Sequence, residues 1–273
     1  MQSFMCLYPV QIKQNGERFT VKCGKCIECQ RALTQEWALR IMLEAREHKQ
    51  NCCLTLTYDN DHVPQDYELS RRDIQLFLKS LRKALSPVKI RIFYSGEYGE
   101  KLGRPHFHCI IFGWIPSDIY FHFTKKGNTY YKSPMCEKIW NRGFVSVGEL
   151  TYETAFYCAK YLQKFAGSSK SVRPFVGMSN RPGIGFGAIT PDLIKSGCFY
   201  YHGEKYVLPR YFQKVLERTA DVSDIARLRV RRRAALTQSL RCSDSDSLDS
   251  RRDKESVFLG KESWEFFINP LDK

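Results

Sequence analysis

The sequence lacks the long apolar segments that membrane proteins and secreted precursors carry. Its 273 residues contain no run of about 18 consecutive apolar residues, the length that a transmembrane helix needs. The N-terminal segment MQSFMCLYPV also lacks the apolar stretch of a secretion signal. The nucleotide-binding pattern G-x-x-x-x-G-K-[ST] is absent as well. We therefore expect a soluble protein of the cell interior that has no membrane partner and that borrows any helicase from elsewhere.

Disulfide bonds are not expected, although the chain has 11 cysteines. The number is odd, the chain is long, and no secretion signal is visible, so the reduced state is favoured. Four of the cysteines (Cys52, Cys53, Cys109 and Cys158) lie inside apolar runs, where cysteine behaves as a small hydrophobic residue. The others include a cluster near the N-terminus that needs a separate explanation.

Acidic residues are scarce relative to basic ones. The chain has 43 Lys and Arg against 29 Asp and Glu, a net charge of +14. Residues 1–212 carry most of this excess, with 30 basic and 18 acidic side chains, against 13 and 11 in the rest of the chain. Aromatic residues make up 14% of the chain, and many stand beside Lys or Arg. This composition favours a nucleic acid partner whose unpaired bases stack on the rings.

Apolar periodicity predicts alternating helices and strands. A helix is expected from Thr34, as its cap, to residue 50, and another after the cap Ser70, with an apolar face of Ile74, Phe77, Leu78, Leu81 and Leu85. Strands are expected at 52–58, 89–99, 106–113 and 143–150, followed by a helix at 151–165. The close pair 89–99 and 106–113 predicts an antiparallel hairpin. The order indicates an α+β fold, a central antiparallel sheet flanked by helices.

Composition also suggests a domain division. Residues 1–50 form an N-terminal segment with the cysteine cluster and a helix, residues 51–212 a core, and residues 213–273 an extension of basic and acidic stretches, partly disordered. Within the core, the Gly- and Pro-rich stretch 167–187 is expected to be a loop that contributes nothing to the hydrophobic interior.

Two histidines are the most informative feature. His106 and His108 are separated by one residue on a predicted strand, so both side chains point to one face. Paired imidazoles are suitable metal ligands, although two surface histidines on an edge strand give the same pattern. The partner strand offers Glu97 as a third ligand, which we prefer to Glu100 because Glu100 lies in the turn. Such a set accepts either Mg²⁺ or Mn²⁺.

A repeated four-residue unit marks the helix at 151–165. Tyr157 and Tyr161 lie one turn apart on one face, and Lys160 and Lys164 form a second stripe beside them. Half-buried tyrosines and solvated lysines of a structural helix are the alternative explanation. A tyrosine is a poor nucleophile at neutral pH unless it is activated, and a divalent ion and a lysine supply that activation at a phosphate. Two tyrosines near one ion permit two successive strand transfers.

The motifs GRPHFH, YxxKYxxK and CGKCIECQ together resemble those of the HUH endonucleases, within the two-tyrosine superfamily of rolling-circle replication initiators. More narrowly, the sequence is similar to the replication initiation proteins of gokushovirus-type microviruses, over about residues 1–165. The resemblance implies an HUH fold of the RRM-like or ferredoxin-like kind. It also implies that His106, His108 and Glu97 bind the metal, that Tyr157 and Tyr161 attack DNA, and that Lys160 and Lys164 bind phosphate.

The resemblance further implies a function. Such an initiator nicks single-stranded DNA at the viral replication origin, keeps a 5′-phosphotyrosine, leaves a 3′-OH for a host DNA polymerase, and later rejoins the displaced strand. It would work in the bacterial host cytoplasm with a host helicase. A related HUH transposase or plasmid relaxase has the same chemistry and remains an alternative. A zinc-containing single-stranded-DNA-binding protein without catalysis is another.

The N-terminal cysteines allow several interpretations. Cys23, Cys26 and Cys29 are spaced by two residues each, and Cys6 supplies a fourth thiol, the number that a structural zinc ion needs. A redox pair or reduced thiols without metal remain alternatives, because the spacing is tight.

Further DNA contacts are expected outside these groups. Lys101, Arg104, Arg173 and Arg181 are candidates for backbone contacts, with ordinary solvated surface as the alternative.

Overall fold

The computed structural model describes residues 6–14, 16–99, 103–125, 127–160, 171–190, 192–201 and 203–241. The chain divides into two compact units. The sheet unit is Trp37–Gly187, and the terminal unit combines Met1–Glu36 with Ala188–Lys273. These units are defined by spatial contacts, and the domain division at residues 50 and 212 stays a prediction.

The sheet unit is built on an antiparallel sheet with the strand order β6-β7-β8-β3-β5-β4-β9. Its strands are β3 (Asn51–Tyr58), β4 (Arg91–Tyr98), β5 (Pro105–Phe112), β6 (Tyr120–Lys125), β7 (Asn128–Lys132), β8 (Gly143–Gly148) and β9 (Phe175–Met178). Its helices are α2 (Arg71–Leu85), α3 (Pro134–Trp140), α4 (Tyr152–Lys160) and the second half of α1 (Ile27–Arg46). The expected α+β fold with a central antiparallel sheet is confirmed.

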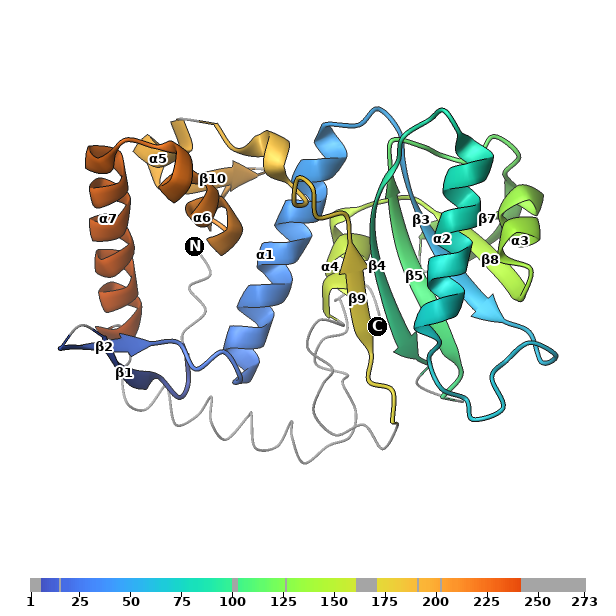
Figure 1. Cartoon of the computed structure of the whole chain (residues 1–273), viewed down its shortest axis with the longest axis horizontal. Helices are drawn as coiled ribbons and strands as arrows, with labels where there is room; N and C mark the ends of the chain where they lie inside the picture. The colour runs from blue at the N-terminus through green and yellow to red at the C-terminus, as the bar shows by residue number, and fades with distance from the viewer. Residues whose placement is uncertain are drawn as a thin grey trace. The chain divides into compact units, whose positions relative to one another are not determined.

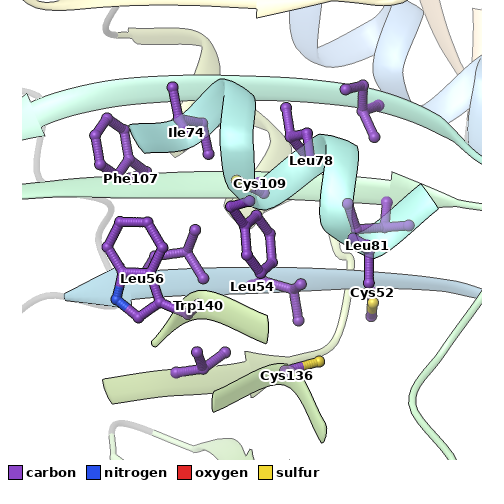
Figure 2. Packing of buried hydrophobic residues seen from close by; sticks show 14 of the residues in the cluster. Cys52, Leu54, Leu56, Ile74, Leu78, Leu81, Phe107, Cys109, Cys136 and Trp140 are labelled. Carbon is purple, nitrogen blue, oxygen red and sulfur yellow. The ribbon is translucent and has the colours of Figure 1, made fainter. Parts of the chain in front are cut away.

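One face of the sheet is covered by α2 and α3 (Figure 1). Ser70 caps α2 by accepting a hydrogen bond of 3.1 Å from the amide of Asp73, as predicted. The predicted apolar face of α2 is fully buried. Figure 2 shows Ile74, Leu78 and Leu81 directed at strand residues such as Leu54 and Phe107. These contacts fix one side of β3 and β5 and thereby the opposite orientation of the alternate side chains.

The other face of the sheet packs against the second half of α1 and against α4. Ala38 and Ile41 of α1 and Ala155 of α4 lie in one core cluster with Phe93 of β4 and Ile110 of β5. Because side chains alternate along β5, His106 and His108 lie on this same face as Ile110. We call it the α4 face.

Two expectations about elements were wrong. Helix α1 begins at Ile27, and Thr34 is a buried residue inside it whose hydroxyl donates to the Gln30 carbonyl at 3.1 Å. The stretch 167–187 is not only loop, because β9 pairs with the outer edge of β4 and its Phe175 is buried. A four-residue strand among Gly and Pro gives almost no periodic signal, and only pairing with an existing sheet edge makes it stable.

The terminal unit contains two small hairpins and several helices. Hairpin β1 (Val10–Gln14) with β2 (Glu17–Val21) leads into the cysteine segment and the start of α1. After the short 3₁₀ turn η1 (Phe186–Ala188), which ends in this unit, come α5 (Asp192–Ser196), β10 (Cys198–Tyr201), β11 (Glu204–Val207), α6 (Arg210–Thr219) and α7 (Val222–Arg241). Among the described residues, no helix has both the length and the apolar character needed to cross a membrane.

Candidate metal and tyrosine site

The register of the β4–β5 hairpin brings three ligand-type side chains together. Glu97 pairs directly with His106, and His108 lies two residues further along the same strand. The Nε2 atoms of His106 and His108 each lie 2.7 Å from Oε1 of Glu97. The candidate ligand atoms all lie within 4.8 Å of one another. We call these residues the His–Glu group.

The second nitrogen of each imidazole is held by a neighbour. Nδ1 of His106 lies 3.1 Å from the carbonyl oxygen of Arg104, and Nδ1 of His108 lies 3.1 Å from the Thr55 hydroxyl. A carbonyl oxygen only accepts hydrogen bonds, so Nδ1 of His106 carries a proton and its Nε2 is the atom available to a cation. Such outer contacts orient histidines that bind metals. The donor set therefore fits a divalent ion held by two nitrogens and one carboxylate.

The environment of Glu97 keeps its carboxylate ionised. The side chain is buried, which by itself raises the pKa of Glu97. Hydrogen bonds from His106 and His108 outweigh burial and hold this pKa well below its usual range. A buried negative charge that faces two imidazoles is the electrostatic setting that a cation requires.

Helix α4 places a tyrosine at the same carboxylate. Thr151 and Thr154 cap the helix reciprocally, each hydroxyl accepting from the other's amide at 3.2 and 2.8 Å. The hydroxyl of Tyr157 donates to Oε1 of Glu97 at 3.1 Å. The ammonium of Lys160 lies 4.3 Å from the centroid of the Tyr157 ring. Tyr157 is 38% exposed, so its hydroxyl meets the His–Glu group from a side that a substrate can reach.

The other predicted site residues are not gathered in this way. Tyr161, Lys164 and Lys101 lie outside the described residues. The guanidinium of Arg104 donates to the Tyr58 carbonyl at 2.7 Å and to the Asn60 side chain at 2.6 Å, and so holds the loop after β3. Its contact with DNA stays a prediction.

Arg173 and Arg181 lie on either side of β9. Positions near the sheet edge are compatible with a DNA contact and with solvated surface alike, so this role also stays a prediction.

Sequence analysis missed Thr55, which touches the site. Thr55 pairs with His108 in the β3–β5 ladder, and its side chain therefore lies on the α4 face. Alternation within LTLTY places Thr55 on the face opposite Leu54 and Leu56, but nothing in the sequence says that β3 is the neighbour of β5. The missing information was the strand order.

The four N-terminal cysteines form a second ligand-type group, in the terminal unit. The Sγ atoms of Cys6, Cys23, Cys26 and Cys29 all lie within 4.8 Å of one another, and all but Cys23 are buried. We call these residues the cysteine group. The amides of Lys25 and Cys26 point at Sγ of Cys23 at 3.4 and 3.3 Å. The tight spacing thus does not prevent the four thiols from converging.

Charge in the cysteine group is shared unevenly. A hydrogen bond from the Cys29 thiol lowers the pKa of Cys26 to about 4, and the same pairing raises the pKa of Cys29. Cys26 is therefore a thiolate at neutral pH, the form that binds metal.

An antiparallel sheet that presents two histidines, a glutamate and a tyrosine at one point defines a class of candidate metal-dependent phosphoryl-transfer proteins. Residues 51–166 match the family model of the replication-associated protein ORF2, and this segment belongs to that family. The match spans all of the His–Glu group and Tyr157.

Replication-associated proteins of three phages are similar to the chain. ORF4 of Chlamydia phage 1 is 33% identical over 225 residues, which cover 76% of this chain and 56% of the relative. VP4 of Bdellovibrio phage phiMH2K is 35% identical over 164 residues, 56% of this chain and 51% of the relative. ORF2 of Spiroplasma virus 4 is 35% identical over 158 residues, 54% of this chain and 49% of the relative.

The chain thus spans about half the length of the curated relatives it matches. No solved structure matches it significantly. The similarity to microvirus replication initiation proteins, expected from the motifs, is confirmed.

Proposed function

We propose that this protein initiates rolling-circle replication of a single-stranded phage genome by nicking DNA at the replication origin with Tyr157. The observation that carries the proposal is the hydrogen bond of 3.1 Å between the Tyr157 hydroxyl and Glu97, the residue on which both histidines converge. The similarity to replication-associated proteins of three phages supports the biological setting. The site of action is then the cytoplasm of the bacterial host, with a host helicase and DNA polymerase as partners.

The residues divide the chemistry between them. His106, His108 and Glu97 hold Mg²⁺ or Mn²⁺, which when bound supplies charge stabilisation to a scissile phosphate. Tyr157 is the nucleophile. Its hydroxyl faces a carboxylate that accepts its hydrogen bond, and Lys160 stands close enough to stabilise a phenolate.

The nicking step is a phosphodiester exchange. A bond forms between the Tyr157 oxygen and phosphorus while the bond from phosphorus to the 3′ oxygen breaks. The phenol loses its proton and the 3′ oxygen gains one from water, so the products are a 5′-phosphotyrosine and a 3′-OH. The phosphoryl linkage is kept in the adduct, and the reverse attack by a 3′-OH rejoins a strand without a nucleotide cofactor. Tyr161 is the proposed second nucleophile and Lys164 its phosphate-binding neighbour.

The test is a cleavage assay on circular single-stranded DNA of the cognate genome with Mn²⁺, read on a denaturing gel. Wild type is compared with Tyr157→Phe, Tyr161→Phe and the double variant. Tyr152→Phe is the matched control, because it removes a hydroxyl from the same helix outside the His–Glu group. A protein-linked DNA band that disappears in the double variant and persists in the control supports the proposal. DNA binding without any nick or adduct favours the non-catalytic binding protein instead.

We propose in addition that the cysteine group holds a structural zinc ion. Four convergent thiols fill a tetrahedral site, and amide hydrogen bonds to sulfur stabilise thiolate charge. A zinc ion bound by four cysteines has no position left for a substrate, so its role is to stabilise the terminal unit.

A further inference from the structure

The α4 face of the sheet continues beyond the His–Glu group toward the β6–β7 edge. Glu97 pairs with His106, His106 with Thr57, and Thr57 with Phe144 of β8. Paired residues of neighbouring strands point to the same face, so Phe144 lies in one row with the proposed metal ligands. It is two strand spacings from His106, about 10 Å.

Independent contacts support this orientation. Val145 and Val147, which flank the alternate positions of β8, lie in the core on the α2 side. A Cβ built on Gly148, the next residue on the α4 face after Ser146, would meet the ring of Tyr130 at 3.8 Å. The Tyr130 ring therefore lies over the same face as Phe144.

Aromatic rings and a lysine line this part of the face in the open. Phe144 is 56% exposed and Phe123 37%. Phe123 stacks on Tyr130 with ring centroids 4.8 Å apart and planes inclined by 22°. The ammonium of Lys132 lies 5.8 Å from the centroid of Phe144. We call Phe144, Lys132, Tyr130 and Phe123 the aromatic track.

The chemistry of the track fits one kind of occupant. The segment 120–132, YFHFTKKGNTYYK, contains three lysines and no acidic residue. Exposed rings interleaved with cations match single-stranded nucleic acid, because unpaired bases stack on the rings irrespective of sequence and lysines contact the phosphates. In duplex DNA the bases are already stacked on one another and cannot use the rings.

We propose that the aromatic track binds the single-stranded DNA that flanks the scissile phosphate, and leads it across β8 and β3 to Tyr157. The proposal rests on the proposed nicking function, which it deepens by assigning a path to the substrate. Continuity of the track with the His–Glu group on one sheet face is the observation that selects DNA as the occupant over an unrelated protein.

The test measures binding of a fluorescein-labelled single-stranded oligonucleotide to the full chain by anisotropy, without divalent ions and at fixed salt. Phe144→Ala and Phe123→Ala each remove one stacking ring, and each should weaken binding by about 5-fold to 150-fold. Phe121→Ala is the matched control. Phe121 pairs with Tyr131, which packs against the α2-side core, and it is 63% exposed. Its loss should change affinity by less than about twofold.

Equal losses in all three variants, or none in Phe144→Ala and Phe123→Ala, overturn the proposal. Sedimentation of the same samples identifies the alternative in which the rings join two copies of the chain, because Phe144→Ala would then dissociate a dimer and leave DNA affinity intact. Thermal melting monitored by circular dichroism shows whether each variant remains folded.

The outcome is separable from that of the nicking proposal. Track-dependent binding by a wild-type protein that forms no adduct supports the track and overturns nicking. Adduct formation together with unchanged binding in both ring variants does the reverse.

Discussion

The His–Glu group and the cysteine group solve the problem of gathering ligands in different ways. The first draws its residues from two paired strands, so sheet register fixes their spacing. The second draws Cys6 and Cys23 from irregular chain and Cys29 from the first turn of α1. A rigid sheet suits a site that must aim a substrate, whereas a loop closed by an ion gains its order from that ion.

The donor sets differ in what they leave open. Three ligands of nitrogen and oxygen leave coordination positions at a divalent ion, and Tyr157 already faces them. Four thiols complete a tetrahedron and leave none. The comparison assigns chemistry to the sheet unit and stability to the terminal unit, and each prediction below tests one side of that assignment.

The largest effect is expected from the histidines. His106→Ala together with His108→Ala should lower the nicking rate by about 10⁴-fold, since the charge stabilisation that a bound ion gives is worth several kcal/mol. The rate of adduct formation is measured with saturating Mn²⁺. The melting temperature serves as the control, because a variant that is merely unfolded loses both. Unchanged nicking with Mn²⁺ would remove the His–Glu group from the mechanism.

Zinc removal should act on the other side of the comparison. Cys26→Ser with Cys29→Ser should abolish the one bound zinc per chain and lower the free energy of unfolding of the terminal unit by on the order of 4 kcal/mol. Metal content is measured by mass spectrometry and unfolding by urea titration. Cys198→Ser, a buried cysteine of the same unit outside the group, is the control.

The two readouts together decide the assignment. If the cysteine variants lose zinc but retain full nicking activity per folded molecule, the roles are separate. A preparation of wild type that contains no zinc when purified from metal-replete cells would contradict the zinc proposal.

A smaller effect is expected from Thr55. Thr55→Val removes the hydroxyl 3.1 Å from Nδ1 of His108 and keeps the β-branched shape. Loss of such an outer contact weakens metal affinity by about 10-fold to 100-fold. The Mn²⁺ concentration that gives half-maximal nicking should rise accordingly, while the rate at saturation changes little. Thr57→Val is the control, because Thr57 occupies the same strand and face one pair further along. Equal shifts in both variants would show that the strand rather than the hydrogen bond matters.

The accuracy of sequence analysis followed the range of the interactions involved. His106, His108 and Glu97 were predictable because strand alternation and one short hairpin bring them together. Ser70 was predictable because a cap is a local interaction. The start of α1 was not, because the CGKCIECQ segment contains Gly and Cys and Ile27 lies inside it.

Long-range pairing produced the remaining errors and gaps. β9 joins the sheet only through its partner β4, and Thr55 reaches His108 only because β3 neighbours β5. The aromatic track was likewise invisible as a surface, since Phe144 and Phe123 belong to strands whose facing depends on sheet order. Composition indicated stacking on bases, but only topology places these rings in line with the site.

The smallest expected effect comes from Glu68 in the sheet unit. Hydrogen bonds from the Tyr98 hydroxyl at 2.7 Å and from the Val172 amide at 2.9 Å lower the pKa of Glu68 from 4.5 to about 2. The ionised carboxylate thus fastens the chain that returns after α4. Because the pKa is lower in the folded state, this contribution is present above pH 4.5 and is lost as the pH falls toward 2.

Glu68→Gln should therefore lower the melting temperature slightly at pH 7 and reduce its acid dependence over that pH window. Tryptophan fluorescence reports mainly on the appropriate unit, because Trp37, Trp114 and Trp140, three of the four tryptophans, lie in the sheet unit. Asp61→Asn, in the exposed loop after β3, controls for the loss of one negative charge. The same slope in wild type and Glu68→Gln would mean that the anchor does not stabilise the sheet unit. A reduced slope would show that the sheet unit derives part of its order from polar contacts that need no metal, unlike the order we ascribe to the cysteine group.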